Sequence, residues 1–461
     1  YSCVRVSFRE MWSALCVTAC ILPALCMGVP LSGDDSGIDV TGWQPRLLGS
    51  TKLKYAAFIE AYFSEDDSLD YADRWTVYCS TFNPANGILG INDKVYYLRA
   101  PGNYINNMSE FHMDKMDQSS HWPNNPDYMP SAAVGTEGIV WSSGFLVPGS
   151  THGQLQMYDT QQDPPAGPVN IASLDENNWS YHKTLFKDMD NDGDLDALTA
   201  RFHVRTLGDP LKELVWLENE NQGMVEGWKQ HVITDGGPDV SFWPVTLTSF
   251  GQEYDAFLVG EFWGQQLSLY WTENEDNDWT HLNSIKKRVI DPTAGQVFDV
   301  LEYDFNQDGV LEFACTSFHE DLGYGEVYKY TIPEDFKEGE FERTTMATDF
   351  IPHDVNGGGM SPGNIKPFSP SKAYSEEVEE DGMPHKSWFL LSGDDAGQMF
   401  IMTPNSTDRS DFAYDRHVLT NTGADIIGKM SYGDFDDDGY TEIVVAYYSE
   451  GAVFYYTYAP E

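Results

Sequence analysis

The sequence predicts an all-β fold, a seven-bladed β-propeller of four-stranded antiparallel blades that is closed by an N-terminal strand. An apolar, aromatic-rich run recurs seven times, its spacing averages about 60 residues, and many of the runs are apolar on both faces. Strands that are apolar on both faces need a sheet packed against either side. A ring of radially stacked small sheets meets this need and protects the sheet edges.

The repeated unit contains strand-like runs in a fixed order. The aromatic-rich runs begin at residues 94, 154, 214, 266, 326, 398 and 452. A second run precedes each of them, at 75–82, 138–145, 196–202, 255–262, 312–318, 387–394 and 442–448. A third run follows several copies, at 228–233, 284–290 and 414–419. Enrichment in Val, Phe, Tyr and Trp, with Gly, Asn and Asp between runs, is typical of strands joined by turns.

The repeat also predicts the domain organisation. Residues 42–461 are 420 residues, which equals seven units of 60. The last copy ends at its third strand, so its blade lacks an outer strand. Because 41–50 resembles 226–236, we expect a strand at 43–48 to complete the last blade and to tie the chain ends together. The alternative is a loose N-terminal arm.

The N-terminal segment is typical of a secretory signal. Residues 12–27 carry no charge, and this run is shorter than the ~20 residues of a membrane span. We therefore expect a signal peptide at 1–28, a short segment at 29–41, a secreted chain and no stable membrane insertion after signal removal. The alternative is an uncleaved anchor. Glycosylation acceptor motifs stand at Asn107, Asn178 and Asn405.

The cysteines and the charge narrow the class of protein further. Only Cys79 and Cys315 lie beyond residue 28, both within apolar runs, so we expect buried free thiols and no disulfide framework.

Acidic residues outnumber basic ones by 73 to 27, for a formal charge of −46. This balance excludes nucleic-acid binding by a basic surface, and it disfavours adhesion to anionic lipid. It fits a soluble protein that meets cations or works in salty surroundings.

Three copies carry an acidic motif just before the second run, with the form D-x-[DN]-x-D-G-x-x-[DE]. Its candidate metal ligands are Asp188, Asp190, Asp192, Asp194 and Asp196; Asp304, Asn306, Asp308, Val310 and Glu312; and Asp434, Asp436, Asp438, Tyr440 and Glu442. Side-chain oxygens at positions 1, 3, 5 and 9, with a backbone carbonyl at position 7, suit Ca²⁺, and glycine at position 6 permits the sharp turn.

A cation is also expected on electrostatic grounds. Two carboxylates ~5 Å apart repel by roughly 3 kcal/mol at an effective dielectric near 20. The motif is not an EF-hand, because position 12 is Thr199, Cys315 or Val445 instead of glutamate. We expect Ca²⁺ at about three sites. The alternative is that these loops are solvated acidic turns without metal.

The repeats and loops together resemble the FG-GAP/VCBS repeat family, the extracellular propeller type also found in integrin α-chain heads. The resemblance is closest over LFKDMDNDGDLDALTARF, LVWLENEN and WKQHVI, within 185–233, and recognisable repeats extend over 180–461. It implies calcium on one face of the propeller and binding surfaces formed by loops on the other.

Candidate ligand-binding residues are expected on the face away from the acidic loops. They are Trp263, His319, His203 and Trp243. Exposed tryptophan beside Asp, Asn and His is typical of a sugar site. The alternative for each of these four residues is that it is an ordinary loop residue without a binding role. Two insertions stand out: 104–137 either caps the central channel or is a surface loop, and 369–386 is expected to be a solvated acidic loop.

The sequence leaves the activity open. It contains no HExxH, GxSxG or GxxxxGK motif, and no catalytic residue can be assigned. The favoured hypothesis is a secreted calcium-binding module that binds or adheres to a glycan or an extracellular protein. The alternative is an extracellular carbohydrate-active enzyme of the polysaccharide lyase or sugar dehydratase type.

Overall fold

A computed structural model of the chain describes residues 42–144, 153–172, 179–203, 210–220, 223–353, 359–423 and 426–461. The expected signal peptide at 1–28, the segment at 29–41 and Asn178 lie outside these ranges. Within the described ranges, no helix combines the length and the apolar composition that crossing a bilayer requires.

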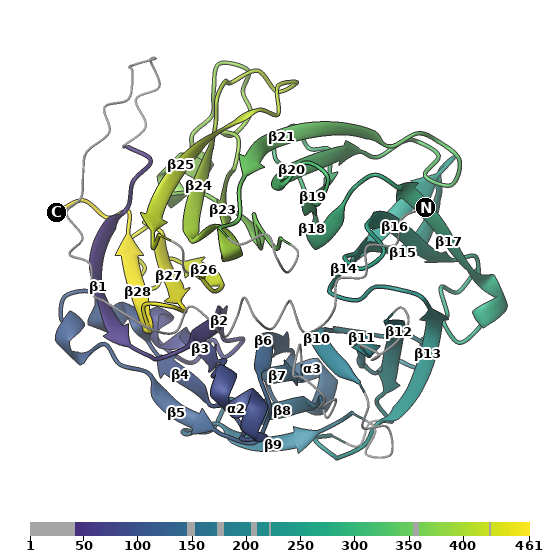
Figure 1. Cartoon of the computed structure of the whole chain (residues 1–461). Coiled ribbons are helices and arrows are strands. Elements are labelled where there is room, and N and C mark those ends of the chain that lie inside the picture. The colour runs from purple at the N-terminus through teal and green to yellow at the C-terminus, as the bar shows by residue number, and fades with distance from the viewer. Residues whose placement is uncertain are drawn as a thin grey trace.

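Seven four-stranded sheets stand in a ring around a central axis (Figure 1). In six of them the strands follow one another in chain order: β2 (Ala56–Phe63), β3 (Trp75–Thr81), β4 (Val95–Arg99) and β5 (Asp114–Asp117); β6 (Pro123–Met129), β7 (Gly138–Ser143), β8 (Leu155–Asp159) and β9 (Ala166–Asn170); β10 (Ser180–Lys187), β11 (Asp196–His203), β12 (Leu211–Glu218) and β13 (Lys229–Asp235); β14 (Ser241–Ser249), β15 (Gln252–Glu261), β16 (Gln266–Thr272) and β17 (Ile285–Asp291); β18 (Gln296–Tyr303), β19 (Glu312–His319), β20 (Tyr324–Thr331) and β21 (Glu342–Phe350); β22 (Ile365–Phe368), β23 (Trp388–Leu391), β24 (Gln398–Pro404) and β25 (Tyr414–Asn421).

The seventh sheet joins the two ends of the propeller. Its order is β1 (Arg46–Lys52), β28 (Ala452–Thr457), β27 (Glu442–Tyr447) and β26 (Met430–Gly433). β1 runs antiparallel to β28, from Arg46 opposite Thr457 to Lys52 opposite Ala452. The prediction that an N-terminal strand closes the last blade is therefore confirmed, although the strand begins at residue 46 instead of 43.

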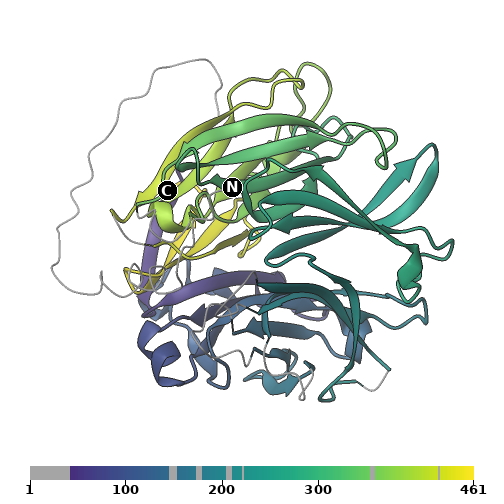
Figure 2. The same cartoon turned by 45° about the vertical axis from the view of Figure 1, so that its right-hand side comes forward.

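Short helical segments interrupt the connections between strands. They are α2 (Pro84–Leu89), α3 (Ser131–Val134) and α4 (Lys372–Glu376), and the 3₁₀ turns η1 (Tyr71–Arg74), η2 (Pro101–Tyr104), η3 (Met108–Glu110), η4 (Leu282–Ser284) and η5 (Asp394–Ala396). The turned view shows that the sheets remain the bulk of the molecule, with the helical segments at its rim (Figure 2).

The hydrophobic core lies between neighbouring blades. One cluster joins Leu258 and Leu269 of the β14–β17 sheet to Val300 and Tyr328 of the β18–β21 sheet. All six residues of β27 are buried, as expected for a strand covered on both faces. Cys79 and Cys315 are buried free thiols, as predicted.

The two predicted insertions are largely built into the blades. Segment 104–137 contains β5 and β6, and its first part packs on the last blade, where the rings of Phe111 and Tyr455 stack with centroids 5.3 Å apart. Segment 369–386 contains α4 and is held by ion pairs of Arg409 with Glu379 at 3.0 Å and Asp381 at 2.8 Å. The first segment thus contributes the β6 wall of the channel, and the second is more structured than a solvated loop.

The junction between the first and last blades generates a prediction. A Cβ atom on Gly102 in η2 would lie 2.2 Å from the carbonyl oxygen of Phe435, which is backbone and cannot rotate away. Gly102→Ala should therefore lower the free energy of unfolding by about 1–3 kcal/mol, the usual cost of overpacking. Thermal unfolding measures this. Gly42→Ala is the matched control, because a methyl group added there would meet nothing within 4 Å. Equal melting temperatures for the two variants would contradict the packing of this junction.

Candidate metal loops and the central cavity

The three acidic loops share one backbone conformation. Their fourth residues adopt positive φ, with 60° at Asn191, 58° at Gln307 and 61° at Asp437. The glycine N–H at position 6 donates to the first aspartate: Gly193 to Asp188 at 3.1 Å, Gly309 to Asp304 at 2.8 Å and Gly439 to Asp434 at 3.0 Å. Each glycine has φ between 85° and 96°, which a residue with a Cβ rarely adopts. The shared motif thus corresponds to one loop shape in three blades.

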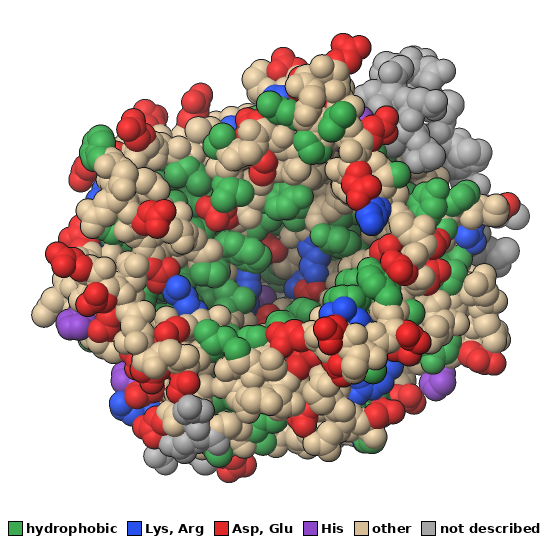
Figure 3. All heavy atoms as spheres, turned by 180° about the vertical axis from the view of Figure 1, so that it is seen from behind, with side chains coloured by type: hydrophobic (Ala, Val, Ile, Leu, Met, Phe, Trp, Pro, Cys, Tyr) green, Lys and Arg blue, Asp and Glu red, His purple; other side chains and the backbone are tan. Residues whose placement is uncertain are grey.

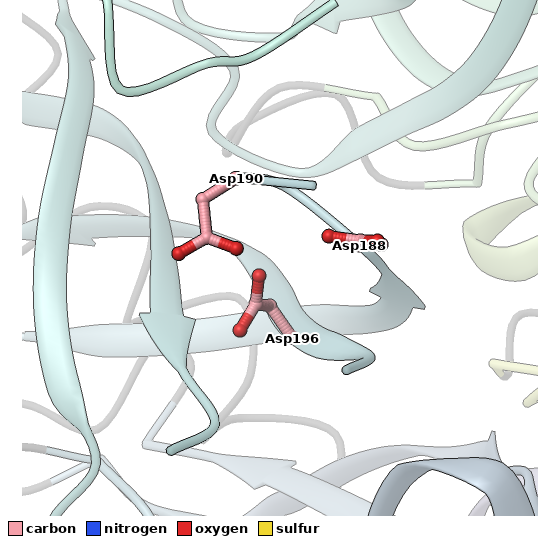
Figure 4. Close-up of side chains that lie close together, drawn as sticks. All are labelled: Asp188, Asp190 and Asp196. Atoms are coloured by element: carbon pink, nitrogen blue, oxygen red, sulfur yellow. The ribbon is translucent and has the colours of Figure 1, made fainter. Parts of the chain in front are cut away.

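Two of these loops gather three carboxylates around a common point. Asp188, Asp190 and Asp196 each offer an oxygen, and these oxygens lie within 4.8 Å of one another (Figure 4). In the last blade, a second triad forms in the same way from Asp434, Asp436 and Glu442. Either triad could hold a metal ion.

One oxygen in each triad is buried without a hydrogen-bond partner among the described residues. These atoms are Oδ1 of Asp188 and Oδ1 of Asp436. A buried carboxylate oxygen without a partner is costly, and a cation would supply the missing interaction. The donor set consists of oxygens only, which suits a hard cation such as Ca²⁺ or Mg²⁺. The residues present therefore fit a metal ion.

Burial and like charge raise the pKa of several carboxyl groups in the triads. Burial, aided by neighbouring aspartates, raises the pKa of Asp196 to about 7 and that of Glu442 to about 8. The same two causes raise the pKa of Asp436 to about 6. The loops therefore concentrate more negative charge than their surroundings favour, which agrees with the repulsion expected from the sequence.

The loop between β18 and β19 differs because Asn306 occupies its third position. The side-chain amide of Asn306 donates to Asp308 and to the carbonyl of Arg409, both at 2.9 Å, and its Oδ1 accepts from Asp308 N at 3.2 Å. Arg409 in turn donates to the Asn306 carbonyl at 2.7 Å. Within the described parts of the chain, two acidic triads form where about three sites were expected. Metal binding by Asp304, Asn306, Asp308, Val310 and Glu312 stays a prediction.

The ligands expected at positions 5 and 7 lie outside the two triads. Asp192 accepts from Asp194 N at 2.9 Å, and Asp438 accepts from Tyr440 N at 2.8 Å, each through Oδ1. These hydrogen bonds shape the turn, and they do not involve Oδ2 of either aspartate. Ligation by Asp192, Asp438 and the backbone carbonyls of Asp194 and Tyr440 stays a prediction.

The four candidate ligand-binding residues do not converge. Trp263 packs edge-on against Phe262, with ring centroids 5.3 Å apart. His203 lies 6.4 Å from the ring of Trp179, again edge-on, and His319 shares a hydrogen bond of 2.7 Å with the hydroxyl of Tyr328. Of the four, Trp243 alone lines the central cavity. Asn107 and Asn405, the glycosylation candidates within the described ranges, are both exposed.

A cavity of about 760 Å³ occupies the centre of the ring, and the first strands of all seven blades contribute to its wall. From behind, the molecule shows a central hollow with apolar side chains on its rim and basic side chains deeper inside (Figure 3). Its wall includes Phe186, Leu301 and Tyr432, which stand two or three residues before the acidic loops. The wall also includes Val240, Asn364 and Lys429, which directly precede first strands, so the cavity extends along these strands from one side of the ring to the side that carries the acidic loops.

Charged residues on the first strands give this cavity a polar wall. They are Glu60, Asp127, Lys183, Asp299 and Lys366, together with Lys429, which stands directly before β26. Sequence reasoning missed them, although a signal was present: Lys183, Asp299 and Lys429 each stand five residues before the first aspartate of an acidic loop. A charged residue at a fixed position in otherwise apolar strands would have indicated a shared polar surface.

The comparisons with known proteins leave the family open. No family model matches the chain, and no curated protein matches it. The chain is similar to the Dos1 propeller, with 8% identity, a TM-score of 0.43 and coverage of 91% of this chain and 95% of that one. It is also similar to the crystal structure of puromycin hydrolase, with 11% identity, a TM-score of 0.43 and coverage of 91% of this chain and 55% of that one. These distant likenesses carry no argument about function.

The two triads predict the number of calcium ions bound. Equilibrium dialysis with metal analysis should find two ions on the parent chain and one on either Asp190→Ala or Asp436→Ala, because each variant loses a carboxylate from one triad. Asp321→Ala, an exposed acid away from both triads, should still bind two. An ion count on either triad variant equal to that of the parent chain would contradict this assignment, whereas a third ion on the parent chain would support the prediction for the loop between β18 and β19.

Proposed function

We propose that this protein is a secreted, calcium-binding propeller of the FG-GAP/VCBS type that serves as an extracellular binding or adhesion module for a glycan or a protein. The observation that carries the proposal is the pair of acidic triads, each with a buried oxygen, Asp188 Oδ1 or Asp436 Oδ1, that lacks a partner among the described residues. Secretion and the type of partner rest on the sequence.

Calcium is favoured over magnesium by the construction of the loops. Ca²⁺ accepts six to eight oxygen ligands in flexible geometry, whereas Mg²⁺ demands near-octahedral geometry and keeps several waters. Each of the two triad loops presents three clustered carboxylates, a further aspartate at position 5 and the carbonyl at position 7 within nine residues. A set of this size, drawn from one short loop, suits the larger and more adaptable ion.

The location of one triad indicates what the metal would do. The backbone of Gly102, from the first blade, lies against Phe435 in the last acidic loop. From the other side, Lys372 N donates to the Gly439 carbonyl at 2.8 Å, and Thr441 N donates to the Pro370 carbonyl at 3.0 Å. A cation in this loop would therefore stabilise the place where three blades meet, and with it the rigid presentation of the surface loops.

One observation favours the enzymatic alternative, a polysaccharide lyase or sugar dehydratase. In the central cavity, burial lowers the pKa of Lys183 and raises that of Asp127 to about 7. Groups with pKa values shifted toward neutrality are suited to proton transfer, and such shifts cluster at functional sites. Formation of an unsaturated product from acidic polysaccharides, followed by absorbance, would favour this alternative over pure binding.

Calcium removal should destabilise the fold. An ion that binds only the folded state stabilises it by about 2.7 kcal/mol when its free concentration is a hundred times Kd. Chelation should therefore lower the melting temperature of the parent by several degrees, and added Ca²⁺ should restore it. Asp190→Ala and Asp436→Ala should melt below the parent in calcium but close to it in chelator, where the substitution also relieves repulsion. An identical parent melt in both buffers would contradict the metal assignment.

Binding should depend on the intact propeller. On arrays of glycans and extracellular-matrix proteins, we expect the parent to bind a defined set of ligands in calcium and to lose most of that signal in chelator. Asp321→Ala serves as the control for nonspecific effects of removing an acid. The proposed function would be contradicted if the parent bound no ligand on the glycan array and none on the protein array.

A further inference from the structure

The central cavity brings lysines and acids together inside a strongly acidic protein. The chain has a formal charge of −46, yet three of its lysines, Lys183, Lys366 and Lys429, line this one cavity beside Glu60, Asp127 and Asp299. Glu60 forms ion pairs with both Lys366 and Lys429. Burial opposes ionisation of Glu60, but the two ammonium groups outweigh it and lower the pKa of this carboxyl. Two of the three lysines are thus matched by an internal acid.

Lys183 is arranged differently. Among the described residues, no carboxylate oxygen lies within 4.0 Å of its Nζ, which donates to the Phe242 carbonyl at 3.1 Å. The ammonium also lies over the ring of Trp243, 4.8 Å from its centroid. An ammonium group has three N–H donors, and the carbonyl accepts from one of them. Asp299, Asp127 and Glu60 stabilise the ammonium charge from a distance, but none of them pairs with Nζ, so its remaining N–H donors can bind an incoming anion.

The nearby acids are occupied by neutral donors. Asp299 accepts from Ser241 Oγ at 2.9 Å and from Val300 N at 3.0 Å. Asp127 accepts from Thr184 N at 2.7 Å and from the side-chain amide of Asn125. Both carboxylates are therefore fixed in the wall by hydrogen bonds, and neither forms an ion pair with Lys183.

The surface beside Lys183 is suited to a sugar ring. The side chain of Trp243 is 36% exposed, within a cavity whose volume lies in the range of small-ligand pockets, about 300–1,000 Å³. An aromatic face packs against the apolar face of a pyranose, while hydroxyl and amide groups of the wall can exchange hydrogen bonds with its hydroxyls. Glu60 and Asp299 repel any anion in this cavity, and they disfavour a doubly charged phosphate more than a carboxylate with a single charge.

We propose that the central cavity binds a pyranose that carries a carboxylate, with the carboxylate at Lys183 Nζ and the sugar ring against Trp243. This inference rests on the proposed glycan-binding function and names both its ligand class and its site. The bound carboxylate accepts hydrogen bonds from Lys183 that no wall carboxylate accepts, and the tryptophan distinguishes a sugar from a simple organic acid.

The test is titration calorimetry on the full chain in calcium and low salt. The probes are the methyl glycosides of glucuronate and galacturonate, with methyl glucoside and methyl galactoside as neutral counterparts. A hydrogen bond to a charged group contributes about 1.5–3 kcal/mol, so we expect at least one uronate to bind about ten- to hundred-fold more tightly than its neutral counterpart.

Matched variants assign that preference to the cavity. Lys183→Gln should abolish it, Lys183→Arg should retain it, and Lys115→Gln, which removes an exposed lysine on β5, should leave it unchanged. Trp243→Ala should weaken both the acidic and the neutral sugar. Because Trp243 is partly exposed, this variant also provides a readout if Lys183→Gln fails to fold.

Several results would overturn the inference: equal affinity for uronate and neutral sugar, binding of acetate as tight as that of uronate, or a preference that survives Lys183→Gln. Unchanged sugar affinity in Trp243→Ala would do the same. A positive glycan or protein array with no uronate preference would leave the proposed function standing and refute this inference alone. A blank array would refute the proposed function itself.

Discussion

The two-sided burial of the blade strands is the constraint on which this structure depends. β7 and β27 are buried along their whole length, so each needs a neighbouring sheet on both faces. An open stack of sheets would leave two such faces in water, and a ring leaves none. Ring closure therefore follows from the composition of the strands, and the pairing of β1 with β28 secures it at the blade where the chain ends meet.

Closure also explains the position of the last acidic loop. The loop that contains Asp434, Asp436 and Glu442 lies where the final blade meets both of its neighbours, through Gly102 on one side and Pro370 on the other. Carboxylates that repel one another at this junction would weaken it, and the same carboxylates around a cation would strengthen it. Without a cation, the negative charge of this loop destabilises the junction. With a cation bound, the same charge would stabilise the contacts among the three blades.

The sequence predicted the features that recur along the chain better than the features that depend on a single residue. Seven copies in register predicted the blades and the second and third strands within a few residues. The closing strand was placed three residues early, because Trp43 resembles a strand residue but instead stacks on His417. In the β18–β19 loop, the motif accepted Asn306 as equivalent to aspartate, whereas contacts with Arg409, about a hundred residues away in the chain, give its amide a different role. The cavity was missed because its charged residues come one at a time from separate strands.

The acidic exterior is compatible with anion binding at a lysine in the cavity because charge acts over a short range in salt. The Debye length is about 8 Å at physiological ionic strength, so acids on the outer strands are largely screened from the channel. Salt screens the buried groups of the cavity wall much less, and there Lys183 faces wall acids that neutral donors already satisfy. A molecule with so large a negative charge would repel anions from most of its surface. It would therefore accept one mainly where an ammonium group offers N–H donors that no carboxylate occupies, as Lys183 does at the axis of the ring.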